Sequence, residues 1–235
     1  ILEFLDMRKP SGGDVHRKCL NLHHAVNLSN NFMNLIENCI KEPTFDDSWN
    51  LVDPHTNKIV RVVSARELWQ KILENRVATG EPYIMFGDTV NESLPQSQKD
   101  LGLTVHHSNL CSEITLPTDE TRTAVCCLSS VNLEKYDEWK QDRMFIPDLI
   151  HFLDNVLQHF IDNAPDTLYR AKFSAVNERS LGLGAMGFHS YLQANNIPFE
   201  SALAKSKNLQ MFKHIKEQAT AESKRLAVKK GEAPD

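Results

Sequence analysis

An amide, a thiol and a carboxylate lie close together in the segment Ser108–Ile114, which reads Ser-Asn-Leu-Cys-Ser-Glu-Ile. Asn109, Cys111 and Glu113 occupy alternate positions, so an extended loop would direct all three side chains to one side. A second thiol, Cys126, follows fifteen residues after the first. A cysteine in such a place can be a nucleophile, a metal ligand, a redox partner or a hydrogen-atom abstractor, so its chemistry decides the function.

A metal site and a hydrolytic site are two alternatives for these thiols. Zinc favours the residue types that are present, which are His106, His107, Cys111 and either Cys126 or Cys127. Structural zinc sites usually carry a C-x₂₋₄-C pair, however, and the chain contains none. A cysteine hydrolase would use a histidine as its base, but ten histidines make a nearby one uninformative.

A buried structural thiol is a third alternative, because cysteine is commonly buried. We expect that role for Cys19 and Cys39, which lie in periodic apolar segments. Cys111 fits it less well, because the loop around it carries asparagine, serine and glutamate. Since a disulfide between adjacent residues is strained, we expect Cys127 to contribute core contacts and not to pair with Cys126.

The segment Gly182–Gly187 matches the dinucleotide fingerprint G-x-G-x-x-G. A true fingerprint follows a strand and is followed, about twenty residues later, by an acidic residue. Here the preceding residues 176–180 are mostly polar, and no acidic residue occurs at that distance. We therefore expect these glycines to permit close contacts at the start of a helix, and we expect no nicotinamide site.

The apolar pattern predicts the elements that must position these residues. Ser29 is a good N-cap, Glu67 completes a capping box with Ser64, and Gly80 is a suitable helix end. Helices are expected after Ser29 and Ser64, from Pro147 onward, after the glycine segment and from about Ser201 to Lys230, and strands are expected at 20–28, 49–52, 59–63, 82–86, 103–105 and 124–128. Strands that alternate with helices predict an α/β fold with largely parallel strands.

Composition excludes several other classes of protein. The 235 residues carry a formal net charge of −5, which argues against nucleic acid as the main partner, and no apolar stretch is long enough to span a membrane. Five cysteines with irregular spacing favour a reducing, cytoplasmic compartment over a secreted disulfide framework. Because the chain starts at Ile1 without a methionine and stops in a loop-like segment, we expect it to be a piece of a longer protein.

The thiol loop closely resembles the Ser-Asn-Leu-Cys-x-Glu-Ile loop of the ribonucleotide reductase large subunit. Other segments resemble the same family in the same order along the chain, and they are Phe4–Lys9, Glu67–Trp69, Thr79–Tyr83, Cys126–Leu133 and Arg179–Gly184. The match is most similar to the aerobic class I type, including bacterial and tailed-phage versions. The resemblance implies that residues 1–235 are the central portion of a ten-stranded α/β barrel, with Cys111 on a finger loop.

The resemblance also implies the site residues. Cys111 would become a thiyl radical that removes the 3′ hydrogen of a ribonucleotide, inside a barrel that excludes water. Glu113 would take the 3′-OH proton as general base, and Asn109 would hydrogen-bond the ribose hydroxyls. The substrate-binding residues would be Ser108, Asn109, Leu110, Cys111, Ser112 and Glu113. Cys126 would be one half of the redox-active disulfide, with a partner cysteine upstream of Ile1.

Cofactors and partners follow from the resemblance in the same way. No cofactor or metal would bind directly to this chain, because a small subunit with a di-iron or other di-metal centre and a tyrosyl radical would supply the radical. ATP and deoxynucleotide effectors would bind elsewhere in the full subunit. The other expected partners are thioredoxin or glutaredoxin, the flanking parts of the subunit and a second large subunit. We expect a ribonucleoside-diphosphate reductase that is inactive as this isolated chain; the alternative is a non-catalytic piece of a split reductase.

Overall fold

The computed structural model describes all 235 residues and has a mixed α/β architecture. The chain divides into two compact units, Ile1–Pro117 and Thr118–Asp235. Each unit is built around one pair of parallel strands, and a β-hairpin adds an antiparallel pair to the first unit. This arrangement confirms the expected α/β class with largely parallel strands.

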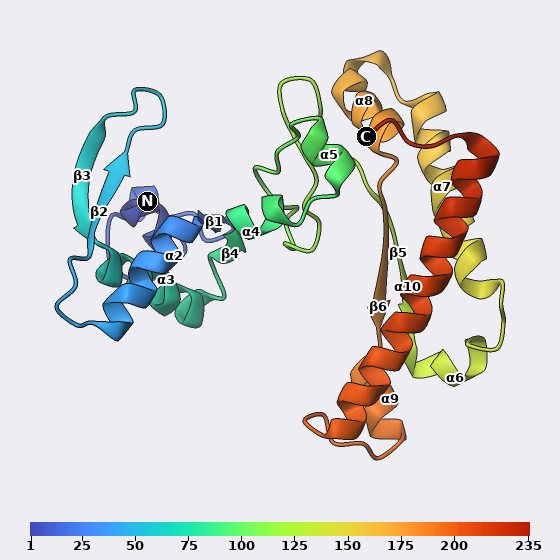
Figure 1. The fold of residues 1–235 in the computed structure, drawn as a ribbon. Coiled ribbons are helices and arrows are strands. Elements are labelled where there is room, and N and C mark those ends of the chain that lie inside the picture. The colour runs from blue at the N-terminus through green and yellow to red at the C-terminus, as the bar shows by residue number, and fades with distance from the viewer. The chain divides into compact units, whose positions relative to one another are not determined.

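The first unit places its parallel strands against two helices (Figure 1). Strand β1 (Ala25–Leu28) pairs with β4 (Tyr83–Phe86), and helices α2 (Asn30–Lys41) and α3 (Ala65–Thr79) pack on them. Val26, Leu28, Phe32, Ile36, Leu68 and Ile72 form the buried centre. The remaining elements are α1 (Leu2–Asp6), a 3₁₀ turn at Val15–Arg17, the hairpin strands β2 (Ser48–Val52) and β3 (Ile59–Ser64), α4 (Gly87–Glu92) and α5 (Gln96–Asp100).

The second unit places two long helices along its strand pair (Figure 1). Strand β5 (Cys127–Asn132) pairs with β6 (Leu181–Met186), and α7 (Phe145–Asn163) contacts both of these strands and α10 (Ala202–Lys230). The largest core cluster includes Val131, Leu133, Ile146, Leu192 and Met211, all almost fully buried. The shorter elements are 3₁₀ turns at Leu133–Lys135 and Asp166–Leu168 and the helices α6 (Tyr136–Trp139), α8 (Tyr169–Glu178) and α9 (Phe188–Ala194).

The helix starts expected at Ser29, Ser64 and Ser201 are confirmed, whereas α7 begins at Phe145 and not at the expected Pro147. The Ser29, Ser64 and Ser201 side chains accept hydrogen bonds from the backbone N–H groups of Phe32, Glu67 and Ala204. Gly80 ends α3 with φ = 79°, a left-handed conformation that costs little only for glycine. The starts of α2, α3 and α10 are therefore fixed by local chemistry that the sequence displays.

Several strand predictions are wrong in position or type. Residues 20–24 form no strand, and the strand expected at 124–128 begins later, at Cys127, and runs to Asn132. Residues 103–105 form no strand, because the Asn91 side chain supplies the hydrogen bonds that a neighbouring strand would give: its Oδ1 accepts from Val105 N and its Nδ2 donates to Val105 O.

The expectation for the glycine segment holds only at its end, because Leu181–Met186 is strand β6 and Gly187 alone stands at a helix start, as the N-cap of α9. A Cβ atom built on Gly182 would lie 2.3 Å from Leu128 Cδ2 and 3.3 Å from Cys126 Sγ. A side chain at position 182 would therefore have to displace the Leu128 side chain and push against the Cys126 sulfur. The residues before the segment form helix α8, so the strand that a dinucleotide fingerprint needs is absent.

Candidate active site

The thiol loop ends in a tight turn. In the first unit, residues 103–117 contain no helix or strand, and their tip is closed by hydrogen bonds between Asn109 and Ile114. Asn109 N donates to Ile114 O at 3.0 Å, and Ile114 N donates to Asn109 Oδ1 at 3.0 Å. Ser112 has φ = 69°, and its N–H donates to Asn109 O at 3.1 Å. The loop tip is therefore a closed turn.

This turn corrects one premise of the sequence argument. We expected an extended backbone at 109–113, in which alternate residues share one face. The left-handed Ser112 breaks that alternation, so position in the sequence does not by itself direct Asn109, Cys111 and Glu113 to one side. The turn assigns Asn109 Oδ1 to the loop itself and leaves its Nδ2 group to donate to a ligand.

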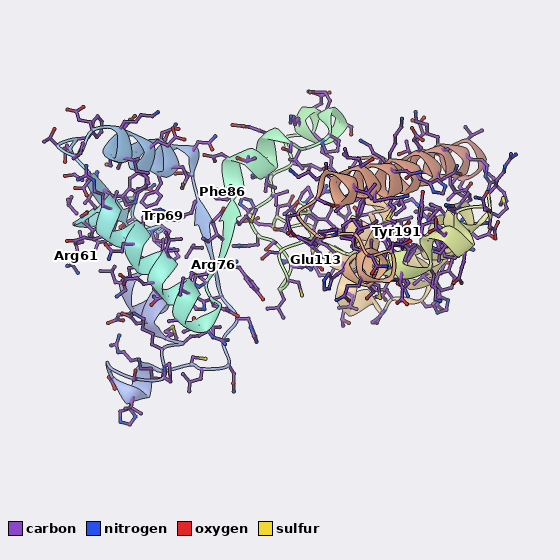
Figure 2. All side chains as sticks on the ribbon, turned by 90° about the horizontal axis from the view of Figure 1, so that it is seen from below. Arg61, Trp69, Arg76, Phe86, Glu113 and Tyr191 are labelled. Carbon is purple, nitrogen blue, oxygen red and sulfur yellow. The ribbon has the colours of Figure 1, made fainter.

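The tip exposes the reactive side chains. Cys111 is a free, exposed thiol, Glu113 is exposed, and Leu110 between the amide and the thiol is 62% exposed. Figure 2 shows Glu113 on this loop and Phe86 at the end of β4. Because Cys111 neither packs in the core nor binds a second sulfur, the buried structural role that fits Cys39 does not apply to it.

The backbone that leads to the loop tip is hydrogen-bonded to other elements of the first unit. Asn27 on β1 donates from Nδ2 to His106 O at 3.2 Å, and Asn91 in α4 bonds both polar backbone groups of Val105. The Val105 side chain is almost fully buried. These contacts hold the backbone before Ser108, while the tip beyond it relies on its own turn.

A cavity of about 380 Å³ lies beside this part of the loop. It is lined by residues from β1, β4, their approaches and the loop, which are His23, His24, Ala25, Val26, Asn27, Tyr83, Met85, His106, His107, Ser108, Asn109 and Leu110. The lining mixes imidazole, amide and hydroxyl groups with apolar side chains. Three of the six residues expected to bind substrate therefore border a cavity of ligand size.

A buried carboxylate joins the approaches to β1 and β4. Glu81 accepts hydrogen bonds from His23 Nδ1 at 2.6 Å and from His24 N at 2.7 Å, and Arg8 Nη1 lies 3.6 Å from it. Burial alone would raise the pKa of Glu81, but these hydrogen bonds and the Arg8 charge outweigh burial and lower it. This network carries no sequence signal, because its members are separated by up to 73 positions and match no motif.

Cys126 lies in the second unit, directly before β5. The thiol is half-buried and lies against Gly182, and its Sγ approaches Cys127 O at 3.8 Å. Burial raises the pKa of the Cys126 thiol, and the charges of Cys127 and Glu178 raise it further. Cys127 packs with Val125 and Leu181 against a buried cluster around Leu157, which confirms that it contributes core contacts.

Three further observations concern the zinc alternative, membrane-spanning helices and the burial of Cys19 and Cys39. No group of three or more His, Cys, Asp or Glu side chains is placed to hold a metal ion, so the zinc alternative finds no ligand set. None of the helices combines the length and apolar character needed to cross a membrane. Cys39 is buried, as expected, whereas Cys19 is only partly buried.

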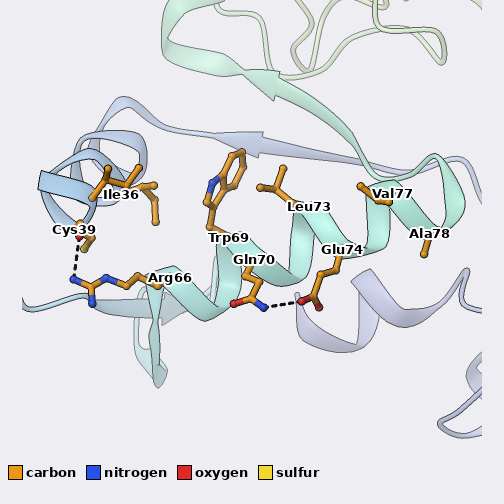
Figure 3. Close-up of a pocket in the computed structure, with 10 residues that line it drawn as sticks. Ile36, Cys39, Arg66, Trp69, Gln70, Leu73, Glu74, Val77 and Ala78 are labelled. Carbon is orange, nitrogen blue, oxygen red and sulfur yellow. Dashed lines mark hydrogen bonds between the residues drawn. The ribbon is translucent and has the colours of Figure 1, made fainter. Parts of the chain in front are cut away.

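A second cavity, of about 560 Å³, is an apolar groove on helices α2 and α3 of the first unit. Figure 3 shows Trp69, Leu73 and Val77 along one side of α3, with Ile36 and Cys39 from α2. Arg66 Nη2 donates to Cys39 O at 3.3 Å, and Gln70 donates to Glu74 at 2.7 Å along the polar border of the groove. The groove contains none of the residues expected to do chemistry.

Together, these observations define an α/β protein that carries an exposed cysteine at the tip of an irregular loop. The model of the family described as "Ribonucleotide reductase, barrel domain" matches residues 1–235 of the chain. The chain therefore belongs to the ribonucleotide reductase barrel-domain family.

Individual relatives agree with this assignment. A Frog virus 3 (isolate Goorha) protein, named as a candidate ribonucleoside-diphosphate reductase large subunit, is 49% identical over 238 residues, which cover 100% of this chain and 40% of that protein. The ribonucleoside-diphosphate reductase large subunit of Invertebrate iridescent virus 3 is 43% identical over 282 residues, with 100% and 45% covered.

A solved structure gives the same result for the fold. The Actinobacillus ureae class Id ribonucleotide reductase alpha subunit superposes with a TM-score of 0.81 at 35% sequence identity, covering 99% of this chain and 40% of that chain. The chain thus spans less than half the length of the relatives that it matches.

Proposed function

We propose that this chain is the part of a ribonucleotide reductase catalytic subunit that carries the radical-forming thiol. The observation that carries the proposal is the exposed Cys111 on a turn closed by Asn109, in a chain that matches the barrel-domain family throughout. The substrate would be a ribonucleoside diphosphate, as the name of the Invertebrate iridescent virus 3 relative indicates for that protein. The product would be the 2′-deoxyribonucleotide.

The loop residues would divide the reaction among them. Cys111, as a thiyl radical, would take the 3′ hydrogen atom of the ribose and later return it. Glu113, which is exposed at the tip, would accept the 3′-OH proton. Asn109 keeps its Nδ2 group free of the turn, so that group would donate to a ribose hydroxyl. Ser108 and Leu110, which border the cavity, would contact the substrate together with Ser112.

Cys126 would supply reducing equivalents from the second unit. When the 2′-OH leaves as water, Cys126 and a partner cysteine would give up two electrons and form a disulfide. Thioredoxin or glutaredoxin would then reduce that disulfide by thiol exchange. The half-buried position of Cys126 beside Gly182 supports this role, because a thiol that is partly shielded still remains open to a partner.

Other parts of the enzyme would supply the radical, bind the effectors and form the subunit contacts. We assign radical generation to a separate small subunit with a di-iron or other di-metal centre and a tyrosyl radical. ATP and deoxynucleotide effectors would bind to other parts of the full subunit, which would also pair with a second large subunit. The reducing partners and the free thiols of the chain fit a cytoplasmic location.

Substitution of Cys111 tests the proposal in the full-length catalytic subunit, reconstituted with its small subunit and a reductant. We expect Cys111→Ser to abolish deoxynucleotide formation, by more than about 10³-fold, because an O–H group does not replace the thiol in reversible hydrogen transfer. The matched control is Cys127→Thr, which keeps a small side chain next to Cys126 and should retain activity. Normal turnover by Cys111→Ser would refute the proposal.

A further inference from the structure

The thiol loop is hydrogen-bonded to the rest of the first unit at one place. Within residues 104–117, only the bonds at Val105 and His106 reach another element, and the others close the loop tip on itself. A tip that is closed in this way moves as one piece if its attachment yields. The location of Cys111 therefore depends on the attachment at Val105 and His106.

Asn91 supplies most of this attachment. Its Oδ1 accepts a hydrogen bond from Val105 N at 2.8 Å, and its Nδ2 donates to Val105 O at 3.0 Å and to Gly87 O at 2.9 Å. Val105 is only 2% exposed, so water does not readily replace these bonds. Loss of the Asn91 amide would therefore leave buried backbone groups of the loop without partners.

Helix α4, which carries Asn91, is itself bonded to neighbouring elements. Asp88 Oδ2 accepts from Asn30 N, at the start of α2, at 2.7 Å, and Glu92 Oε1 accepts from Asn30 Nδ2 at 3.1 Å. Lys99 in α5 donates to Glu92 O at 2.6 Å. Since a helix of six residues has little stability of its own, these bonds fix its place. Asn91 thus holds the loop from a fixed element.

Asn27 on β1 adds a bond to the next residue of the loop. Its Nδ2 donates to His106 O at 3.2 Å. A Cβ atom built on Gly87 would lie 2.5 Å from Asn27 Oδ1, so the first residue of α4 lies directly against the Asn27 amide. Two amides, one from β1 and one from α4, therefore hold consecutive residues of the loop.

We propose that Asn91, supported by Asn27, is a positioning residue that sets the location of the Cys111 thiol through the backbone of Val105. The catalytic consequence rests on the proposed function: hydrogen transfer needs the sulfur close to the ribose carbon, and a misplacement of about 1 Å can cost about 10²-fold in rate. The location of the loop does not rest on that function.

The experiment measures how widely Cys111 is distributed in space. Nitroxide labels are attached to Cys111 and to Val77→Cys, a position on α3 that is 90% exposed, and double electron–electron resonance gives the distribution of their separation. The other thiols are removed by Cys19→Ala, Cys39→Ala, Cys126→Ala and Cys127→Ala. In Asn91→Ala we expect the distribution to broaden by about twofold or more, because the loop loses its main attachment. Asn27→Ala, which removes one bond, should broaden it less.

Asn75→Ala is the matched control in the same unit. Asn75 on α3 is fully buried and donates from Nδ2 to Leu5 O at 2.9 Å, so its loss weakens the first unit without removing a bond to the loop. This variant should keep the distribution of the unmodified chain. Circular dichroism shows whether each variant is folded. If Asn91→Ala does not fold, Asn91→Asp decides in the same way, because it keeps an acceptor for Val105 N but loses the donor to Val105 O.

An unchanged distribution in the folded Asn91 variant, or equal broadening in Asn75→Ala, would overturn the inference. Unchanged turnover of that Asn91 variant in the full-length catalytic subunit would also overturn it, because we expect a loss of about tenfold or more. The distance measurement does not depend on turnover. Failure of the proposed function would appear as activity in Cys111→Ser, which leaves the distances in the Asn91 variants untouched.

Discussion

Glu81 is a buried side chain whose charge holds together segments that are distant in sequence. Its carboxylate accepts hydrogen bonds from His23 Nδ1 and His24 N, and Arg8 lies within ion-pair distance. Because these groups come from the approaches to β1 and β4, the carboxylate fixes the place where the parallel pair begins. The same approaches line the cavity beside the thiol loop, so this one side chain helps to hold residues that line the cavity.

The charge of Glu81 should make the stability of the chain depend on pH. Its pKa in the folded chain is lower than the ordinary value of 4.5, so its contribution is complete above the unfolded pKa and is lost as the pH falls through the folded value. We expect Glu81→Gln to reduce the free energy of unfolding by about 2 kcal/mol at pH 7.

Urea unfolding at pH 7 and at pH 3 measures this contribution. The difference between the unmodified chain and Glu81→Gln should shrink at pH 3, because below the ordinary pKa of 4.5 the unfolded chain takes up a proton that the folded carboxylate resists. Glu74→Gln serves as a control, because this glutamate lies on the exposed border of the groove on α3. A difference that is equally large at both pH values would show that Glu81 acts through shape and not through charge.

At the scale of elements, helix α3 has two apolar faces, of which one is buried and the other is exposed. Ile72 is 2% exposed and packs in the centre of the first unit, whereas Val77 is 90% exposed at the groove. The periodic pattern includes both residues, so the sequence does not tell which side chain is buried. Only the packing of α2 and the strands against α3 separates the two faces.

A matched pair of truncations on α3 tests this assignment. Ile72→Ala should destabilise the chain by about 3 kcal/mol, because it removes buried methyl groups and leaves a cavity. Val77→Ala should change the free energy of unfolding by less than about 0.5 kcal/mol, because its side chain is already in water. Urea unfolding of both variants gives the comparison, and a cost at Val77 close to that at Ile72 would mean that this face is covered in solution.

The features that sequence predicted correctly are those whose causes lie within a few residues. The caps at Ser29, Ser64 and Ser201 and the helix end at Gly80 depend on neighbours within one turn, so their chemistry is visible in the sequence. The residues of the thiol loop also lie within one short segment, but their chemical roles stay predictions. The turn of this loop was missed, since the left-handed Ser112 carries no sequence signal as strong as a glycine.

The features that sequence reasoning missed depend on distant partners. Residues 103–105 have a strand-like sequence, but Asn91 takes the place of a neighbouring strand. The glycines of β6 were assigned to a helix start, because nothing nearby reveals that Leu128 and Cys126 lie over Gly182. Glu178 and Arg122 are 56 positions apart, so their buried ion pair appears only in the folded chain.

At the scale of the whole molecule, the proposed reaction needs more than this chain supplies. Cys111 is exposed here, whereas a carbon radical has to be kept from water and from other quenchers. Cys111 and Cys126 belong to different compact units, yet both would have to act on one ribose. The chain also covers only 40% of the solved relative that it superposes on. Enclosure and alignment of the two thiols are therefore expected from the rest of a catalytic subunit.

We accordingly expect the chain alone to form no deoxynucleotide when it is supplied with small subunit, reductant and substrate. Adding the flanking segments of a catalytic subunit should restore turnover, and these segments should co-elute with the chain in size-exclusion chromatography, because they would cover the exposed thiol loop. The control is the same mixture with Cys111→Ser, which should still co-elute but should remain inactive. Co-elution without turnover in the unmodified mixture would favour a non-catalytic piece of a split reductase. Turnover by the chain alone would contradict the expectation, because it would mean that the exposed loop needs no further enclosure.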